Sequence, residues 1–308
     1  MPGTPSPFAQ ENYDPDPNLK IWMNGELVPA PDAKVNVFDH GVLYGDGVFE
    51  GIRSYNGRVF ERQAHLRRFF DGLRAITLEI PYSHAELDHA LDAALAANRL
   101  QDADKDAYIR LVATRGVGVL GISPRRTWKP CVFIIAASIA MYPAEMYERG
   151  MPVIVSSVTR NHPNAMSPRI KSLNYLNNIL AKIEALDAGV QEAIMLNHMG
   201  YVAEATGDNV FIVRDGQLQT PHSAAGILEG ITRKVIIRLA REAGIEVIEK
   251  ELERMDLYCA DECFLTGTGA QLIPVNEIDK RPVGDGTVGP ITKRLIAAYD
   301  ALVRRAPD

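Results

Sequence analysis

The chain has few cysteines and no long apolar stretch. Cys131, Cys259 and Cys263 are its three cysteines in 308 residues. This low, odd number favours a reducing compartment, and we expect a cytoplasmic protein. Cys131 opens the apolar run CVFIIAA and is expected in the core. The other two lack a further pair of ligands at zinc-site spacing, so we expect no metal site. No apolar run is long enough to cross a bilayer, so no membrane span is expected.

The chain also lacks an excess of basic residues. Lysine and arginine total 33 against 39 aspartate and glutamate residues, which gives a formal net charge of -6. We therefore expect no broad attraction to nucleic acid or to an anionic membrane. The start, MPGTPSPFAQENYDPDPN, lacks the basic and apolar regions of a signal peptide. It is rich in proline and polar residues and predicts a mobile tail over residues 1–18.

Several common catalytic motifs are missing. The chain contains no P-loop, no H-E-x-x-H and no G-x-S-x-G. The stretch GTGA, residues 267–270, ends a strand-like run. It lacks the third glycine and the following helix of a dinucleotide-binding fingerprint. Any chemistry must therefore be inferred from other residues.

Strand and helix signals alternate along the chain, which predicts an α/β or α+β architecture. Residues 19–138 predict an N-terminal α/β domain, 139–151 a linker and 152–308 a C-terminal domain. Asn56-Gly57 predicts a hairpin turn. Ser83 and Glu86 form a capping-box motif at the start of a predicted helix. Helices are expected over residues 64–76, 83–100, 230–244 and 289–305.

The segment SPRIKSLNYLNNILAKIEA, residues 167–185, places Lys171 four residues before Tyr175. A lysine that attacks a carbonyl must be neutral. Because free lysine has a pKa of ~10.4, it needs burial or positive neighbours to lower that value. Lys182 lies opposite the apolar stripe of the same segment and is predicted to be solvated. The stripe predicts a helix and consists of Leu173, Leu176, Leu180 and Ile183.

If Lys171 binds pyridoxal 5'-phosphate as a Schiff base, four further groups are required. The phosphate needs a cation and a helix N-terminus, and the ring nitrogen needs a carboxylate. The ring hydroxyl needs a hydrogen-bond partner, and the substrate carboxylate needs donors. Each candidate also has a plain structural interpretation, as a turn, a packing residue or a solvated charge. The candidates are Arg68, Tyr175, Glu204, the helix start at Gly230, Ile231 and Thr232, and the turn at Thr268, Gly269 and Ala270.

Six segments in order then resemble the fold type IV pyridoxal-phosphate aminotransferases, and most closely the branched-chain amino acid aminotransferases. The resemblance covers the chain from about Ile21 onward. It implies a smaller N-terminal α/β domain, a larger C-terminal domain with a barrel-like sheet, and a homodimer or higher assembly. The segments are HGVLYGDGVFEGIR, KSLNYLNN, GYVAEATGDNVFIV, LEGITR, DECFLTGTGA and GPITKR.

The resemblance also implies a role for each residue. Lys171 matches the Schiff-base lysine, Tyr175 the partner of the ring hydroxyl and Glu204 the partner of the ring nitrogen. The phosphate-binding positions are Arg68, Ile231, Thr232 and Thr268. The substrate-side positions are Tyr44, Phe49, Gly51, Tyr108, Arg110, Gly269 and Ala270.

Arg110 resembles the arginine that receives the distal carboxylate of glutamate, and Arg53 is a second candidate of this kind. Leu120 and Ile122 resemble an apolar loop that reaches into the partner subunit's site. Two features depart from the family. The chain reads GTGAQ where GTAAE is common, and no tryptophan follows CVFIIAA, Tyr142 being the nearest aromatic residue.

The implied reaction transfers an amino group between leucine, isoleucine or valine and 2-oxoglutarate. Lys171 would move the proton between the substrate Cα and the cofactor. Alternatives of the same fold are a D-amino acid or (R)-amine transaminase and an aminodeoxychorismate lyase. Two more distant alternatives are a cofactor-free Schiff-base lyase of the aldolase kind and a non-enzymatic module that binds a phosphate ligand.

Overall fold

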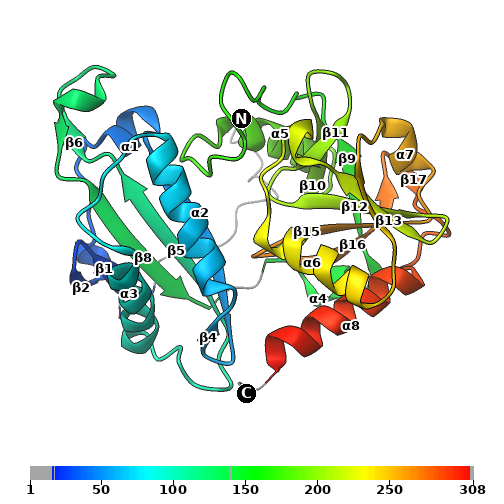
Figure 1. Cartoon of the computed structure of the whole chain (residues 1–308), viewed down its shortest axis with the longest axis horizontal. Coiled ribbons are helices and arrows are strands. Elements are labelled where there is room, and N and C mark those ends of the chain that lie inside the picture. The colour runs from blue at the N-terminus through cyan, green and yellow to red at the C-terminus, as the bar shows by residue number, and fades with distance from the viewer. Residues whose placement is uncertain (1–15, 17, 139–140, 306–308) are drawn as a thin grey trace, which may run out of the picture.

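The computed structural model describes residue 16 and residues 18–138 and 141–305. The predicted tail, residues 1–18, lies outside the described residues apart from Asp16 and Asn18. Figure 1 shows two lobes side by side, an N-terminal lobe (residues 18–138) and a C-terminal lobe (residues 141–305).

The N-terminal lobe is built on a sheet with the strand order β2-β1-β8-β5-β3-β4, in which neighbouring strands are antiparallel. The predicted hairpin at Asn56-Gly57 is confirmed, because both residues have positive φ between β3 and β4. A separate ribbon pairs β6 (Val117–Gly118) with β7 (Thr127–Trp128). The strands of the main sheet are β1 (Lys20–Met23), β2 (Glu26–Pro29), β3 (Gly47–Tyr55), β4 (Arg58–Val59), β5 (Ala107–Thr114) and β8 (Cys131–Ala137).

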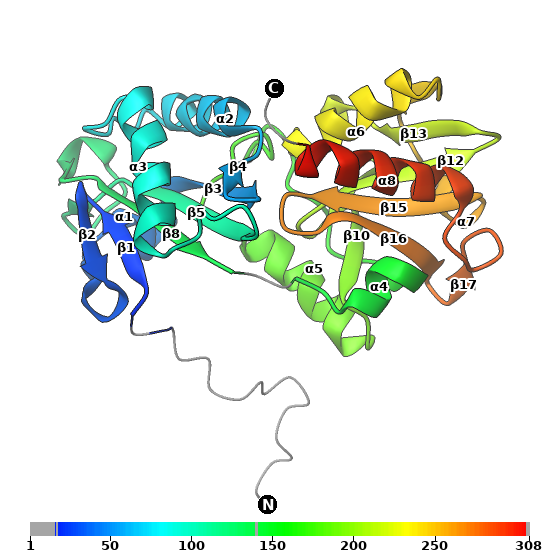
Figure 2. The same ribbon diagram turned by 90° about the horizontal axis from the view of Figure 1, so that it is seen from below.

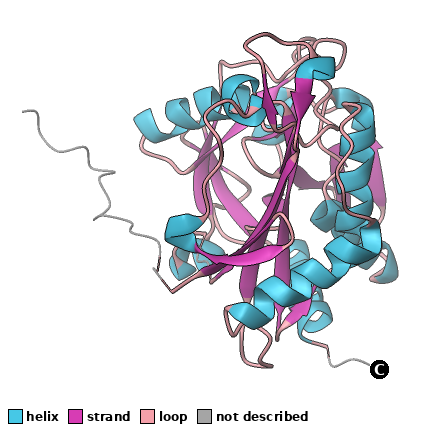
Figure 3. Ribbon diagram, turned by 90° about the vertical axis from the view of Figure 1, so that its left-hand side faces the viewer, coloured by secondary structure: helices cyan, strands magenta, loops and turns pink. Residues whose placement is uncertain are grey.

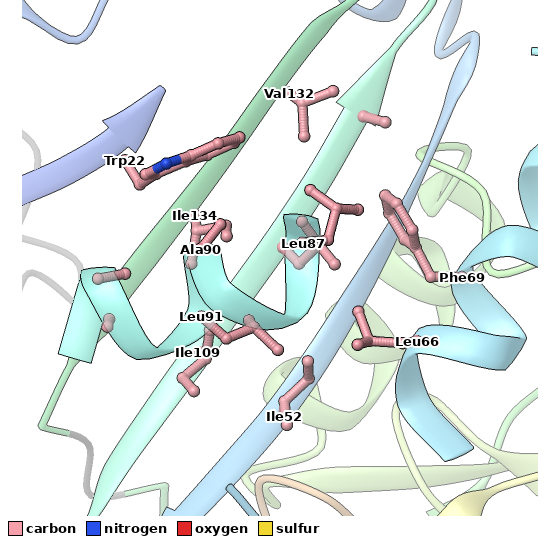
Figure 4. Packing of buried hydrophobic residues seen from close by; sticks show 14 of the residues in the cluster. Trp22, Ile52, Leu66, Phe69, Leu87, Ala90, Leu91, Ile109, Val132 and Ile134 are labelled. Atoms are coloured by element: carbon pink, nitrogen blue, oxygen red, sulfur yellow. The ribbon is translucent and has the colours of Figure 1, made fainter. Parts of the chain in front are cut away.

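Helices α2 (Arg62–Ala75) and α3 (His84–Ala97) pack on this sheet and bury its apolar face. Figure 4 shows this core, where Leu66 and Phe69 of α2 and Leu87 of α3 meet strand residues such as Ile52. The predicted capping box at Ser83 is present, with Glu86 bonding back to the Ser83 amide. Shorter elements of the lobe are α1 (His40–Tyr44) and the 3-10 turns η1 (Ala30–Asp32) and η2 (Pro124–Arg126).

The C-terminal lobe is built on a second sheet, with the order β11-β10-β9-β16-β15-β12-β13-β14 and β17 beside β16. Strand β9 is parallel to both β10 and β16, and β13 is parallel to β14. The strands are β9 (Met151–Val155), β10 (Glu192–Leu196), β11 (Val202–Ala205), β12 (Asn209–Arg214), β13 (Gln217–Pro221), β14 (Val247–Lys250), β15 (Glu262–Gly267), β16 (Gln271–Ile278) and β17 (Arg281–Pro282).

Helices lie outside this sheet, and Figure 2 shows α8 along β15. Helix α6 packs beside α8, and both helices contact β15 and share one buried apolar cluster. Figure 3 shows the same layering, with strands inside and helices around them. The helices are α4 (Ala144–Arg149), α5 (Leu176–Asp187), α6 (Ile231–Glu242), α7 (Arg254–Tyr258) and α8 (Pro290–Arg304), with the 3-10 turn η3 (Ser223–Ala225).

The mixed architecture confirms the predicted α/β or α+β class. The chain passes from the first sheet to the second within the predicted linker, residues 139–151, where a short helix, α4, lies. The predicted domain boundaries stay predictions. Within the described residues, no helix combines the length and the apolar composition needed to cross a bilayer.

One helix differs from its prediction. Helix α5 begins at Leu176, so Leu173 lies before it. The other stripe residues, Leu176, Leu180 and Ile183, are exposed in this chain rather than packed in its core. Lys171 therefore stands in the loop that enters the helix, and its position is fixed by contacts with the other lobe.

Candidate active site

A cavity of about 720 Å³ is lined by both lobes. It is lined by every residue that the sequence assigned to the cofactor or the substrate, except Tyr44 and the second arginine candidate, Arg53. Those brought together are Phe49, Gly51, Arg68, Tyr108, Arg110, Lys171, Tyr175, Glu204, Ile231, Thr232, Thr268, Gly269 and Ala270. A cavity of this size suits a small-molecule site with a cofactor.

Lys171 is held in the cavity by strand β3 of the N-terminal lobe. The amide of Phe49 donates to the Lys171 carbonyl at 2.9 Å, and the Leu173 amide donates to the Gly47 carbonyl at 3.0 Å. The Lys171 Nζ lies 3.1 Å from the Tyr175 hydroxyl and 4.6 Å from the centre of the Phe49 ring. The amine is thus placed against an aromatic surface, with a hydroxyl as its hydrogen-bond partner.

Glu204 lies on β11 and is buried beside an arginine. Its Oε1 accepts from Nε of Arg160 at 2.9 Å, and its Oε2 accepts from the Leu228 amide at 2.9 Å and from Nδ2 of Asn209 at 3.2 Å. Burial still raises the pKa of the Glu204 carboxyl above its ordinary value, because the Arg160 charge and the Leu228 N–H offset only part of the lost hydration. A further positive group next to this carboxylate would favour its charged form.

One end of the cavity is formed by the start of a helix. Ile231 and Thr232 form the first turn of α6, whose preceding residue, Gly230, supplies no side-chain cap. The early N–H groups of a helix carry partial positive charge and favour anions. Thr268 stands nearby in the turn between β15 and β16. Thr266, on the same strand face, has a buried hydroxyl with no hydrogen-bond partner among the described residues.

Arg68 reaches this end of the cavity from α2, held by a buried carboxylate. Glu50 Oε1 accepts from Arg68 Nε at 2.7 Å, and Oε2 accepts from Nη2 at 2.8 Å. The same Oε2 lies 2.8 Å from Nδ1 of His65, and Arg68 Nη1 donates to the Glu229 carbonyl at 3.1 Å. Burial opposes ionisation of Glu50, but Arg68 and His65 outweigh it and lower its pKa to about 2. Glu50 therefore fixes the direction of the arginine.

The opposite wall comes from neighbouring strands β3 and β5. Arg110 lies with its guanidinium 4.6 Å from the centre of the Phe49 ring, and its Nη2 donates to the Tyr108 hydroxyl at 3.0 Å. Gly51 is needed here, because a Cβ at this position would lie 2.2 Å from that hydroxyl. This wall combines apolar surface with one cation, as an amino acid pocket for apolar and acidic side chains requires.

Tyr44 does not line the cavity of its own chain. It ends α1, and its hydroxyl accepts from the Gly121 amide at 2.8 Å. Leu120 and Ile122, in the same loop, are 74% and 84% exposed. Arg53 turns instead to the C-terminal lobe, where its Nη1 donates to the Gly269 carbonyl at 2.7 Å.

The side chain of Lys182, predicted to be solvated, is only 32% exposed. Lys182 lines the cavity and lies 3.6 Å from Oε2 of the buried Glu192. Asp208 lines the same part of the cavity, and among the described residues none donates a hydrogen bond to its carboxylate. Burial and the Glu192 charge raise the pKa of Asp208 to about 7, against the opposing charges of Lys182 and Lys171. The helix turns Lys182 inward because its apolar stripe faces outward.

Several residues that shape the site were not predicted from the sequence. Glu50 could have been found, because an acidic residue inside the apolar strand VFEGIR signals a buried partner. Arg160 and Asp208 carry no such signal, since each lies in a polar segment. Only the fold brings them to the site. Arg160 follows β9 and contacts Glu204 on β11, and Asp208 lies in the turn between β11 and β12.

The family model described as amino-transferase class IV matches residues 47–278, which is more than half of the chain. The chain belongs to the class IV aminotransferase family. This membership confirms the predicted fold type and the prediction that the chain is an enzyme. It gives no support to the aldolase-type lyase or to the non-enzymatic binding module.

Individual class IV aminotransferases resemble the chain over most of its length. A protein of Methanocaldococcus jannaschii, provisionally named a branched-chain-amino-acid aminotransferase, is 50% identical over 90% of this chain and 94% of its own. The solved branched-chain amino acid aminotransferase of Escherichia coli has a TM-score of 0.88 at 40% identity, covering 92% of this chain and 94% of that one.

A second solved enzyme, the T.th. branched-chain amino acid aminotransferase with pyridoxamine 5'-phosphate, also has a TM-score of 0.88. It is 39% identical and covers 93% of this chain and 95% of that one. Other structures of the T.th. enzyme hold N-(5'-phosphopyridoxyl)-L-glutamate or 4-methylvaleric acid. These ligands belong to that protein, and they indicate which probes to apply to this chain.

Proposed function

We propose that the protein is a branched-chain amino acid aminotransferase that uses pyridoxal 5'-phosphate to exchange amino groups between leucine, isoleucine or valine and 2-oxoglutarate. The observation that carries the proposal is the shared cavity of Lys171, Tyr175 and Glu204, with an anion-binding helix start at one end. The names of relatives at 40% and 50% identity support the same activity.

The donor set fits this cofactor. Lys171 would hold it covalently through Nζ, and Tyr175 would hydrogen-bond its ring hydroxyl. Glu204 would face its ring nitrogen. A proton on that nitrogen would place a further positive charge beside the carboxylate, whose present partners offset only part of the effect of burial. The phosphate would lie at the start of α6, with contacts from Arg68, Ile231, Thr232 and Thr268.

The protein's own residues then perform two tasks. When bound, pyridoxal phosphate supplies an aldehyde for the amino group and a ring that withdraws electrons from the substrate Cα. Lys171 Nζ would take the proton from the substrate Cα as general base and would then give it to the cofactor as general acid. Tyr175 orients that amine. Glu204 keeps a proton on the ring nitrogen, with Arg160 holding its carboxylate in place.

The same wall would receive both kinds of substrate side chain. Phe49 and Tyr108 offer apolar surface to a branched side chain, and Arg110 offers a cation to the distal carboxylate of glutamate. The turn at Gly269 and Ala270 would receive the α-carboxylate. The glutamate and 4-methylvaleric acid complexes of the T.th. enzyme support this pairing of acidic and branched ligands.

We further propose a homodimer, in which Tyr44, Leu120 and Ile122 close the partner's cavity. Support comes from large apolar side chains left exposed on α1, in the loop between β6 and β7 and on α5. Ile183→Glu, on α5, should shift the mass measured by light scattering toward a single chain. An unchanged mass would show that this face is not the interface.

The visible spectrum of the purified protein tests the proposed activity. A bound aldehyde cofactor should give absorbance that changes on adding L-leucine or L-glutamate, but not D-alanine. Lys171→Ala should abolish turnover while the circular dichroism spectrum stays native. Lys182→Ala is the matched control, because Lys182 lines the same cavity.

Borohydride reduction followed by peptide mass spectrometry adds a second readout. The cofactor mass should be found on Lys171 and not on Lys182. Turnover by Lys171→Ala, or a cofactor attached elsewhere, would overturn the proposal. A response to D-alanine alone would indicate the D-amino acid transaminase instead.

A further inference from the structure

Gly269 lies in the turn that would receive the substrate carboxylate, yet its backbone does not require glycine. Its φ lies outside the left-handed region that disfavours other residues. What glycine provides is space. A Cβ at this position would lie 3.2 Å from both Cε and Sδ of Met141 and 3.3 Å from its Cγ. The Met141 side chain therefore packs directly on the bare face of the turn.

The turn itself is fixed and cannot retreat from Met141. The Gly269 carbonyl accepts from Nη1 of Arg53 in the other lobe. Gln271, at the far end of the turn, has a positive φ of 62°, and its Nε2 donates to the Tyr55 hydroxyl at 2.9 Å. A side chain added at residue 269 would therefore displace Met141 rather than the turn.

Met141 is the movable side of this contact. It is 44% exposed and lines the cavity, whereas the next residue, Tyr142, is half-buried against the core of the C-terminal lobe. Methionine is unbranched and has a polarisable sulfur, so it adapts to the space available. Pushed away from the turn, its side chain would take up room that the cavity now leaves open.

We propose that Met141 and Gly269 together set the size of the side-chain pocket. Seated on the glycine, Met141 forms an apolar wall that leaves room for long and bulky apolar side chains, those of leucine and phenylalanine rather than valine alone. The inference rests on the proposed function and adds to it a pair of residues that determines specificity. It also gives a role to the glycine of GTGAQ that stands where GTAAE has alanine.

The test measures the binding of unreactive carboxylates to the holoenzyme by isothermal titration calorimetry. The probes are isovaleric acid, 4-methylvaleric acid and hydrocinnamic acid, which carry the side chains of valine, leucine and phenylalanine without the amine. Gly269→Ala should weaken the two longer acids relative to isovaleric acid by about tenfold, the lower end of what one methylene is worth in an apolar pocket. Met141→Ala should favour hydrocinnamic acid.

The double variant decides whether the two residues act together. In the Met141→Ala background, Gly269→Ala should leave the ranking of the three acids unchanged, because no side chain remains to be displaced. The same loss in both backgrounds would overturn the proposal. Met199→Ala is the matched control, because Met199 is exposed and lies outside the cavity.

Failure of the inference and failure of the proposed function look different. If the unmodified holoenzyme binds none of the acids and does not transaminate leucine, the proposed function is wrong, and the inference falls with it. If it does both, but Met141→Ala keeps the original ranking, only the inference is wrong. This second comparison remains decisive even if Gly269→Ala fails to fold.

Discussion

Two buried carboxylates, one from each lobe, are stabilised in different ways. Glu50, from the N-terminal lobe, is fully enclosed, and its two oxygens meet Arg68 twice and His65 once. Asp208, from the C-terminal lobe, is almost as deeply buried, but no described residue donates to its carboxylate. The pKa of Glu50 is lowered to about 2, whereas that of Asp208 is raised to about 7.

Glu50 has a structural role because its charge is fixed, whereas the charge of Asp208 changes with pH. A carboxylate surrounded by donors stays charged and fixes its neighbours, as Glu50 fixes Arg68. A buried carboxylate without donors changes its charge near neutral pH, although the charges of Lys182 and Lys171 oppose the rise of its pKa. The charge of Glu50 is therefore constant near neutral pH, whereas the charge of Asp208 responds to pH.

The largest effect is expected from Glu50→Gln. The substitution leaves Arg68 buried without its anion, and breaking a buried pair typically costs about 3–5 kcal/mol. We expect a loss of this size in the free energy of unfolding of the apoprotein at pH 7, measured in urea. Glu148→Gln, at an exposed position of α4, should change it by less than about 0.5 kcal/mol. Similar values for the two variants would contradict the scaffold role.

The pH dependence of the same loss sharpens the comparison. The pKa of Glu50 lies below its ordinary value of 4.5 in the folded state. Its stabilising contribution is therefore complete above pH 4.5 and disappears as the pH falls toward about 2. The difference in the free energy of unfolding between the unmodified protein and Glu50→Gln should therefore become smaller as the pH falls from 4.5 toward about 2.

A smaller effect of opposite sign is expected from Asp208→Asn. The pKa of Asp208 rises from an ordinary 3.8 to about 7 on folding, so ionisation makes the folded state less stable as the pH rises between these values. The variant lacks this penalty. At pH 8 it should be more stable than the unmodified apoprotein by about 2–4 kcal/mol, and the gain should vanish near pH 4.

Thermal unfolding of the apoprotein at a series of pH values measures this gain. Asp104→Asn, at an exposed position, should show no pH-dependent difference. A variant that is equally destabilised at every pH would mean that the Asp208 carboxylate has partners in the folded state.

The smallest effect is expected from Lys182→Met. Lys182 opposes the rise of the Asp208 pKa, so its removal should move the midpoint of the pH-dependent stability upward by about one unit. The change in stability itself should stay near 1 kcal/mol, because Lys182 is partly solvated. Lys34→Met, at an exposed position, serves as the control. A downward shift of the midpoint would mean that Lys182 does not face Asp208.

Local signals predicted the elements well. The Asn56-Gly57 turn, the Ser83 capping box and the helix that begins at Pro290 are each decided within a few residues of sequence, and each is confirmed. The same reasoning did not predict which face of α5 is exposed: its apolar stripe is exposed, and Lys182 lies on the opposite, cavity-lining side. An apolar stripe indicates a face that avoids water, but it does not say whether the chain's own core or another molecule covers it.

The order of motifs determined the family and the residues worth testing, because the backbone amides, the lysine and the carboxylate of such a site occur in recognisable local contexts. Only the tertiary structure decided which charges face one another. Arg160 contacts Glu204, and Arg68 contacts Glu50, through pairs of residues far apart in the chain. Lys182 lies beside Glu192, which comes from the neighbouring strand β10. Burial and partners, which set the pKa of a buried group, exist only once the two sheets have formed.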